Sequence, residues 1–254
     1  MKRYLGFFLT MFITHVMAQP PVESKAYAWR KPANKNSESI FSTVLFEGSA
    51  RDMAFIQMSA NAITTTNRVN FETPANEEQL LLVRSGLLSV SFNDSTWRLG
   101  PASVVLLLPS QKFSLQNVGS DSCTFFLMKY RSTLPVDKQR GVQAGGSLVR
   151  DWDKVAYKPH DKGGIRNYFE RPTAMCRRLE MHVTTLKEGL RSHDPHTHRA
   201  EEIVLVIGNK TEMQIGERFY KGGPGTVYYL GSNEAHAIRN DGMGACSYFA
   251  FQFE

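Results

Sequence analysis

The sequence predicts an all-β protein built from two tandem double-sheet barrels of the jelly-roll type. Short runs rich in Val, Ile, Leu, Phe and Tyr alternate with turn signals, while helical periodicity is weak throughout. One stretch of the first half also recurs in the second half, which is the signature of a repeated structural unit. Evenly spaced strands separated by such turns are typical of jelly-roll barrels.

The repeat gives the internal organisation. Residues 100–117 match residues 223–240 without a gap at an offset of 123 residues, from an initial Gly-Pro to a closing Asn. Upstream, residues 77–83 match residues 201–207 at an offset of 124, which predicts a one-residue difference in the intervening hairpin. We therefore expect two copies of one all-β unit.

The domain boundaries follow from composition. Residues 19–131 are predicted to form the N-terminal barrel, preceded within that range by an arm that reaches about residue 36. Residues 132–164 combine Pro and Gly with mixed charge and are predicted to be a connector, which leaves residues 165–254 for the C-terminal barrel.

Residues 1–18 are predicted to be a secretory signal peptide. Lys2 and Arg3 precede an apolar run that is too short to span a bilayer comfortably, and cleavage is expected between Ala18 and Gln19. We expect a periplasmic or secreted protein without stable membrane insertion after cleavage. A retained N-terminal membrane anchor is the alternative.

Charge and cysteine content narrow the function further. The net charge is +6 from 30 basic and 24 acidic residues, and no long Lys/Arg run is interleaved with aromatic residues, so we expect no nucleic-acid partner. Cys123, Cys176 and Cys246 cannot all pair with one another. Cys123 and Cys246 occupy matching positions of the repeat, which predicts buried small hydrophobes and not redox partners.

The histidines of the second copy point to chemistry. His196 and His198 are separated by one residue, so on a β-strand they project from the same face. A carboxylate from Glu201 or Glu202 and the later imidazole of His236 could close around the same cation. Three neutral nitrogens and one anionic oxygen suit a divalent transition metal with coordination positions left open.

The spacing of these residues resembles the two conserved motifs of the cupin superfamily. Three residues separate His198 from a glutamate, and the interval from Gly225 through His236 to Asn240 is also that of a cupin. The sequence departs from the pattern at Gly231 and Asn233, where cupins usually have Pro and Gly. The resemblance implies two cupin barrels with one divalent metal, and it assigns as ligands His196, His198, Glu202 and His236, with Glu202 preferred over Glu201.

The first copy lacks this ligand pattern. Counting back from Glu78 places Glu72 and Pro74 at the positions of the two histidines, and Phe113 at that of His236. Proline and phenylalanine side chains cannot bind a metal, so we expect the N-terminal barrel to be a structural or dimer-forming partner with an apolar interior. Pairing of exposed barrel edges makes a homodimer an expectation as well.

Three polar residues outside the ligand set are candidates for catalysis. His193 precedes the ligand segment and could act as a general acid or base, although an exposed loop residue is the alternative. His182 and Arg178 alternate on one strand, where an inward face would let His182 transfer a proton and Arg178 hold a carboxylate. Tyr228 and Gln252 are candidate pocket-lining residues.

The two-barrel layout with one metal site is similar to that of ureidoglycine aminohydrolase and its bicupin relatives. That resemblance implies a metal, usually manganese, and release of ammonia from a small ureido acid, although that family has Gln where this chain has His236. Iron, nickel and zinc accept the same ligands. The alternatives are an uronate or keto-sugar isomerase or a dioxygenase of the cupin type, and, in another class, a non-catalytic metal- or ligand-binding cupin. In each case the expected partner is a small molecule.

Overall fold

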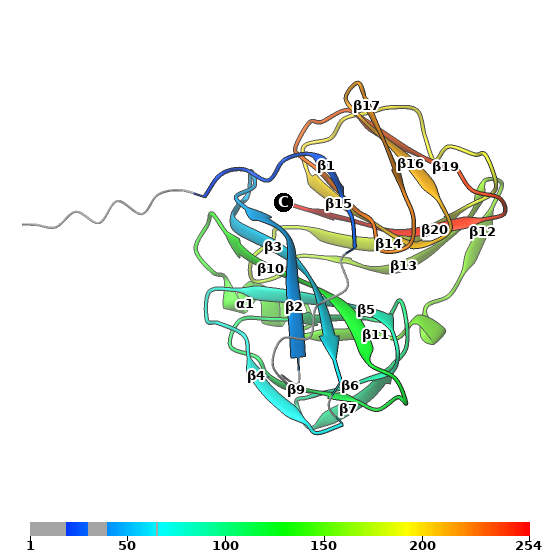
Figure 1. The fold of residues 1–254 in the computed structure, drawn as a ribbon. Coiled ribbons are helices and arrows are strands. Elements are labelled where there is room, and N and C mark those ends of the chain that lie inside the picture. The colour runs from blue at the N-terminus through cyan, green and yellow to red at the C-terminus, as the bar shows by residue number, and fades with distance from the viewer. Residues whose placement is uncertain (1–18, 30–39, 65) are drawn as a thin grey trace, which may run out of the picture.

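The computed structural model describes residues 19–29, 40–64 and 66–254. The predicted signal peptide, residues 1–18, lies outside the described residues. Two β-barrels stack on one another, and the larger sheet of each barrel faces the other (Figure 1). The chain is thus an all-β protein of two tandem cupin-type barrels, as the sequence predicts.

The N-terminal barrel consists of two antiparallel sheets. In the described part of the chain, the strands of the larger sheet are, in spatial order, β11 (Leu148–Arg150), β8 (Val104–Leu107), β5 (Glu78–Ser85), β10 (Cys123–Ser132), β3 (Met53–Ile63) and β2 (Ile40–Gly48). Those of the smaller sheet are β4 (Val69–Glu72), β9 (Lys112–Asn117), β6 (Leu88–Phe92) and β7 (Ser95–Leu99).

The C-terminal barrel repeats this arrangement. Its larger sheet has the described strands β1 (Lys25–Tyr27), β18 (Val227–Leu230), β15 (Glu201–Gly208), β20 (Cys246–Phe253), β14 (Leu179–Leu186), β13 (Gly163–Arg171) and β12 (Lys158–His160). Its smaller sheet has β17 (Arg218–Gly222), β16 (Thr211–Ile215) and β19 (His236–Asn240).

The strand registers of the two barrels are related by a single offset. Gln79 pairs with Leu107 in the first barrel, and Glu202 pairs with Leu230 in the second, which gives an offset of 123 residues. The hairpins that follow, from β6 to β7 and from β16 to β17, are related by the same offset. The offset of 124 predicted for the upstream segment is therefore wrong, because the run of similar apolar residues on both sides of β5 allowed a one-residue slip.

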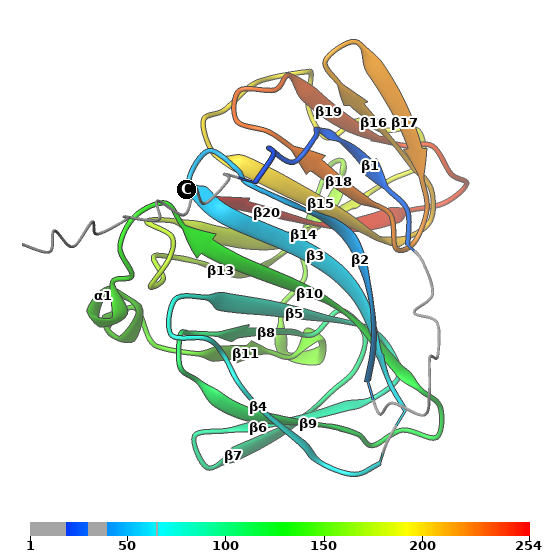
Figure 2. The same ribbon diagram turned by 60° about the vertical axis from the view of Figure 1, so that its left-hand side comes forward.

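Each barrel receives one edge strand from the segment that precedes the other. β1 lies before the first barrel in the sequence but pairs with β18 of the second, where Lys25 is opposite Tyr229. β11 lies before the second barrel but pairs with β8 of the first, where Leu148 is opposite Leu106. The two pairings again differ by 123 residues in both partners, so the exchange is reciprocal (Figure 2).

The segment 132–164 contains short elements that belong to both barrels. Besides β11 and β12 it holds α1 (Lys138–Gln143) and the 3-10 helix η1 (Trp152–Lys154). Asp137 caps α1 by accepting a hydrogen bond from the Arg140 backbone N–H. Within the described residues, no helix has the length and apolar character needed to cross a membrane.

Apolar side chains fill the space between the barrels as well as the inside of each one. The alternation of side chains along β20 sends Phe249, Phe251 and Phe253 toward the other barrel, while Tyr248 and Ala250 face the interior of their own. The same cluster between the barrels includes Met58 and Phe126 from the first unit, among others. Hence the two barrels share one continuous core.

The three cysteines are free and buried, as predicted. Cys123 and Cys246 lie inside the first and second barrel, respectively, and burial raises the pKa of both thiols, to about 12 for Cys123 and about 11 for Cys246. They behave as small apolar residues.

We expect Phe251→Ala to lower the free energy of unfolding by about 3–5 kcal/mol, because it opens a cavity in the core shared by the barrels. Phe251 is 0% exposed, whereas Phe219 is 59% exposed and provides the matched control. Phe219→Ala should change stability by less than about 0.5 kcal/mol. Urea denaturation monitored by circular dichroism measures both, and equal losses would contradict a shared core.

Candidate metal centre

A pair of backbone hydrogen bonds brings His196 and His236 together. The His196 N–H donates to the carbonyl of His236 at 3.2 Å, and the His236 N–H donates to that of His196 at 3.0 Å. His236 is the first residue of β19, whereas His196 forms only an isolated bridge within a loop. The predicted strand over His196 and His198 is thus wrong, although His196 is still paired with β19.

The turn before β19 fixes His198. The carbonyl of His198 accepts a hydrogen bond from the Asn233 N–H at 2.8 Å. Asn233 has a φ of 60°, the left-handed conformation that asparagine tolerates better than most residues. This explains why Asn233 can replace the glycine usual in cupins: the turn keeps its shape.

Strand β15 supplies the carboxylate. Side chains alternate along the strand, so that Glu202 faces the barrel interior while Glu201 faces the other barrel. There Glu201 accepts hydrogen bonds from the Arg51 N–H at 2.9 Å and the Tyr229 hydroxyl at 2.8 Å. Glu202 is therefore the glutamate that joins the histidines.

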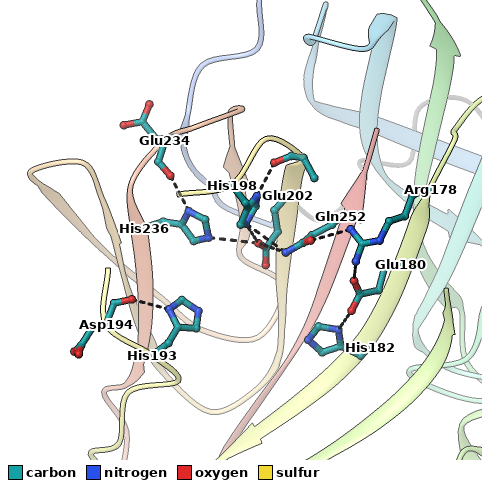
Figure 3. A network of polar contacts seen from close by, with 11 residues as sticks. Arg178, Glu180, His182, His193, Asp194, His198, Glu202, Glu234, His236 and Gln252 are labelled. Carbon is teal, nitrogen blue, oxygen red and sulfur yellow. Dashed lines mark hydrogen bonds and ion pairs between the residues drawn. The ribbon is translucent and has the colours of Figure 1, made fainter. Parts of the chain in front are cut away.

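The four side chains converge on one point. One ring nitrogen from each of His196, His198 and His236 lies within 4.8 Å of the others. The Oε2 atom of Glu202 lies 3.0 Å from Nε2 of His198 and 3.4 Å from Nε2 of His236 (Figure 3). His236 and Glu202 are buried, and His196 is exposed, so the site opens to solvent on the His196 side.

Backbone carbonyls set the orientation of two rings. Nδ1 of His198 donates to the carbonyl of Ala200 at 2.7 Å, and Nδ1 of His236 donates to that of Glu234 at 2.8 Å. Each neutral ring then presents an unprotonated Nε2 to the centre, as a metal ligand must. Nε2 of His236 is buried without a hydrogen-bond partner among the described residues. These donors fit a divalent transition metal, which would satisfy that nitrogen.

The electrostatics of the site favour the protonation states that a metal needs. Burial acts to raise the pKa of Glu202, but hydrogen bonds from His198 and His236 outweigh it and hold that pKa well below its usual range. Burial, followed by the neighbouring imidazoles His193, His236 and His198, lowers the pKa of His196. At neutral pH the site thus offers an ionised carboxylate and a neutral His196.

A cavity of 210 Å³ lies beside the four residues, inside the C-terminal barrel. Of the predicted catalytic candidates, His182 and His193 line it. His193 is exposed and packs edge-on against His196, with ring centroids 4.1 Å apart. Nδ1 of His182 lies 3.2 Å from Oε1 of Glu180.

Arg178 does not line the cavity but reaches it through Gln252. Arg178 pairs with Glu170 at 2.8 Å and with Glu180, and it donates from Nη1 to Oε1 of Gln252 at 3.2 Å. Because arginine can only donate, this contact turns the amide nitrogen of Gln252 toward Glu202, at 3.2 Å. Arg178 thus orients a neighbour of the ligands and holds no substrate carboxylate in this arrangement.

Sequence reasoning placed one pocket residue wrongly and missed another. Gln252 lines the cavity, whereas Tyr228 is buried elsewhere and its hydroxyl lies 3.0 Å from Oγ1 of Thr211. Tyr248, which was missed, does line the cavity. The alternation along β20 that places Gln252 inside also predicts Tyr248, four residues earlier.

The corresponding positions of the N-terminal barrel carry no ligand set. Phe71 is paired with Phe113 in the register, just as His196 is with His236. By the same hydrogen-bond pattern Thr73 corresponds to His198, and the strand register makes Gln79 the counterpart of Glu202. The predicted counterparts Glu72 and Pro74 are therefore corrected to Phe71 and Thr73, while Phe113 is confirmed.

Comparisons with known proteins agree with this geometry. Residues 182–251 match the family model of the cupin domain. Among solved structures, the chain is similar to the protein Ylba from E. coli (15% identity, 87% of this chain and 86% of that one covered, TM-score 0.66). It is also similar to AerE from Microcystis aeruginosa (16% identity, 90% and 98% covered, TM-score 0.66). A third structure is an oxalate decarboxylase from Lactobacillus farciminis (10% identity, 91% and 86% covered, TM-score 0.66). No curated protein sequence matches the chain.

At these identities the structural similarity concerns the fold alone. Together with the family match over residues 182–251, it agrees with the two barrels and the histidine cluster of the second one. The chain therefore has the fold of two tandem cupin barrels, and its C-terminal half contains a cupin domain.

Proposed function

We propose that the chain binds one divalent transition metal in its C-terminal barrel and uses it to convert a small polar, anionic metabolite. The ligands are His196, His198, Glu202 and His236. The observation that carries this proposal is the convergence of three ring nitrogens within 4.8 Å beside a carboxylate oxygen, with the buried Nε2 of His236 lacking a hydrogen-bond partner in the described structure.

Manganese is the metal we favour, because the resemblance to manganese-dependent bicupins suggests it; imidazole and carboxylate also accept iron, nickel and zinc. When bound, the cation would polarise a carbonyl of the substrate and stabilise negative charge on its oxygen. The exposed position of His196 leaves an approach to the site from solvent.

The cavity residues supply proton transfer and selectivity. A volume of 210 Å³ admits only a compact substrate. Glu180 accepts a hydrogen bond from Nδ1 of His182, which leaves Nε2 of His182 to take up or deliver a proton. Apolar side chains, among them Val204 and Ile238, line the rest of the cavity and limit the water in it.

Hydrolysis of a ureido acid with release of ammonia is the reaction we favour, on the basis of the layout shared with ureidoglycine aminohydrolase. Isomerisation of an uronate or keto-sugar acid is the second candidate, and His182 on the cavity wall favours it, since such a reaction needs a group that moves a proton between carbon atoms. Dioxygenation and non-catalytic binding remain as outcomes that the tests below separate.

We expect His196→Ala to abolish metal binding, with about one metal per chain in the parent protein and almost none in the variant. His196 is exposed, so the fold should tolerate the change. Inductively coupled plasma mass spectrometry after purification without added metal gives the ratio. His160→Ala, in β12 away from the site, is the control and should keep the metal. Full occupancy in His196→Ala would refute the ligand assignment.

Arg178→Met should weaken metal binding about 10- to 100-fold, because Gln252 loses the donor that orients it beside Glu202. Arg177→Met is the matched control, since Arg177 is exposed and lies outside the cavity beside the metal site. Competition with a chromogenic chelator measures both affinities. Equal affinities of the two variants would show that Arg178 has no positioning role.

His182→Ala should lower kcat about 10²- to 10⁴-fold while the metal content stays the same, as expected for loss of a general acid or base. The manganese-loaded protein is incubated with small ureido acids and with uronates. Ammonia assays and NMR then distinguish hydrolysis from isomerisation. If no substrate of either class turns over, the proposed reactions are wrong, even where metal binding holds.

A further inference from the structure

The N-terminal barrel contains a cavity of 440 Å³ at the place that corresponds to the metal site. The offset of 123 residues relates its lining to that of the second barrel: Phe113 takes the position of His236, Gln79 that of Glu202 and Lys129 that of Gln252. The chain thus has two equivalent cavities, of which one has lost every metal ligand.

The walls of this cavity are mainly apolar. Phe71 stacks on Phe113, with ring centroids 5.3 Å apart and an interplanar angle of 24°. Phe125 and leucines from several strands complete the apolar lining: Leu81, Leu107, Leu115 and Leu127. A volume of 440 Å³ lies within the range of about 300–1,000 Å³ that is usual for small-molecule sites. The cavity could therefore hold an apolar group of the size of a benzene ring with a short side chain.

One part of the lining is polar, and its charges are distributed unequally. Lys129 lies opposite Gln79 in the register of β10 and β5. Gln79 donates to Oε1 of Glu77 at 2.9 Å, so this buried carboxylate already has a partner. Glu72 is exposed, where water and salt screen its charge.

Lys129 itself is only half-buried and has no hydrogen-bond or ion-pair partner within the described ranges 19–29, 40–64 and 66–254. Its ammonium group therefore remains available to an anion that enters the cavity. A carboxylate is the simplest such anion for an otherwise apolar site.

We propose that the N-terminal barrel is a metal-independent binding site for a small organic acid with an apolar body. The carboxylate pairs with Lys129, and the body packs against the stacked rings of Phe71 and Phe113. This site would make the first barrel a receptor for a ligand that differs in chemistry from the polar substrate of the second. The proposal does not depend on the function proposed for the metal centre.

Phenylacetate and octanoate test the proposal by isothermal titration calorimetry. Because a carboxylate could also bind a metal, the titration uses the full-length His196→Ala variant after treatment with a chelator. We expect saturable binding of at least one of the two acids at one site per chain. Phenylacetamide, which keeps the body but has no charge, should bind more than about tenfold more weakly than phenylacetate if the latter binds.

Two further substitutions in that background locate the site. Lys129→Met should weaken the acid about tenfold or more, whereas Lys158→Met, at an exposed lysine of β12, should have no effect. Leu127→Trp adds volume to the cavity wall and should abolish binding. Thermal denaturation confirms that each variant is folded, and Ser59→Ala, a milder change of the same lining, replaces any that is not.

The outcomes separate cleanly. Binding that requires Lys129 and is blocked by Leu127→Trp supports the proposal. Failure of both acids to bind, or binding that neither substitution alters, overturns it. Neither result bears on metal binding by the second barrel, which the chelated background has removed from the measurement.

Discussion

The backbone bridge between His196 and His236 is the constraint on which the candidate site depends. Two hydrogen bonds, of 3.2 and 3.0 Å, hold an irregular loop against the first residue of β19. They place two imidazoles side by side without the need for a regular strand. The interior face of β15 then adds Glu202, and the Asn233 turn fixes the backbone at His198. The ligand set is thus assembled by the barrel framework, and the side chains only have to supply the donor atoms.

The same framework occurs twice, which shows how one fold can serve two different interiors. The offset of 123 residues applies to every strand pairing compared and to the exchanged edge strands β1 and β11. What changes is the chemistry at equivalent positions: the imidazole pair of the second barrel is a pair of stacked phenyl rings in the first. Because the barrels share a core through side chains such as Phe249 and Phe251, neither interior has to carry the stability of the whole chain.

The fold and the ligand types could be predicted from the sequence, because both rest on local periodicity and spacing. Exact registers could not: β5 is apolar on both faces, so alternation does not reveal which of Glu77, Glu78 and Gln79 faces inward, and the slip placed Glu72 and Pro74 where Phe71 and Thr73 belong. The choice between Glu201 and Glu202 did follow from spacing, and the contacts of Glu201 with Arg51 and Tyr229 explain it. The role of Arg178 could not be foreseen, since it depends on Gln252, which lies 74 residues away.

The most direct test of this account is the crystal structure of the manganese-loaded protein, with anomalous diffraction to locate the ion. The account predicts one anomalous peak in the C-terminal barrel, in contact with Nε2 of His198 and His236, a ring nitrogen of His196 and the carboxylate of Glu202. A peak elsewhere, or an ion bound without His236 and Glu202, would contradict it.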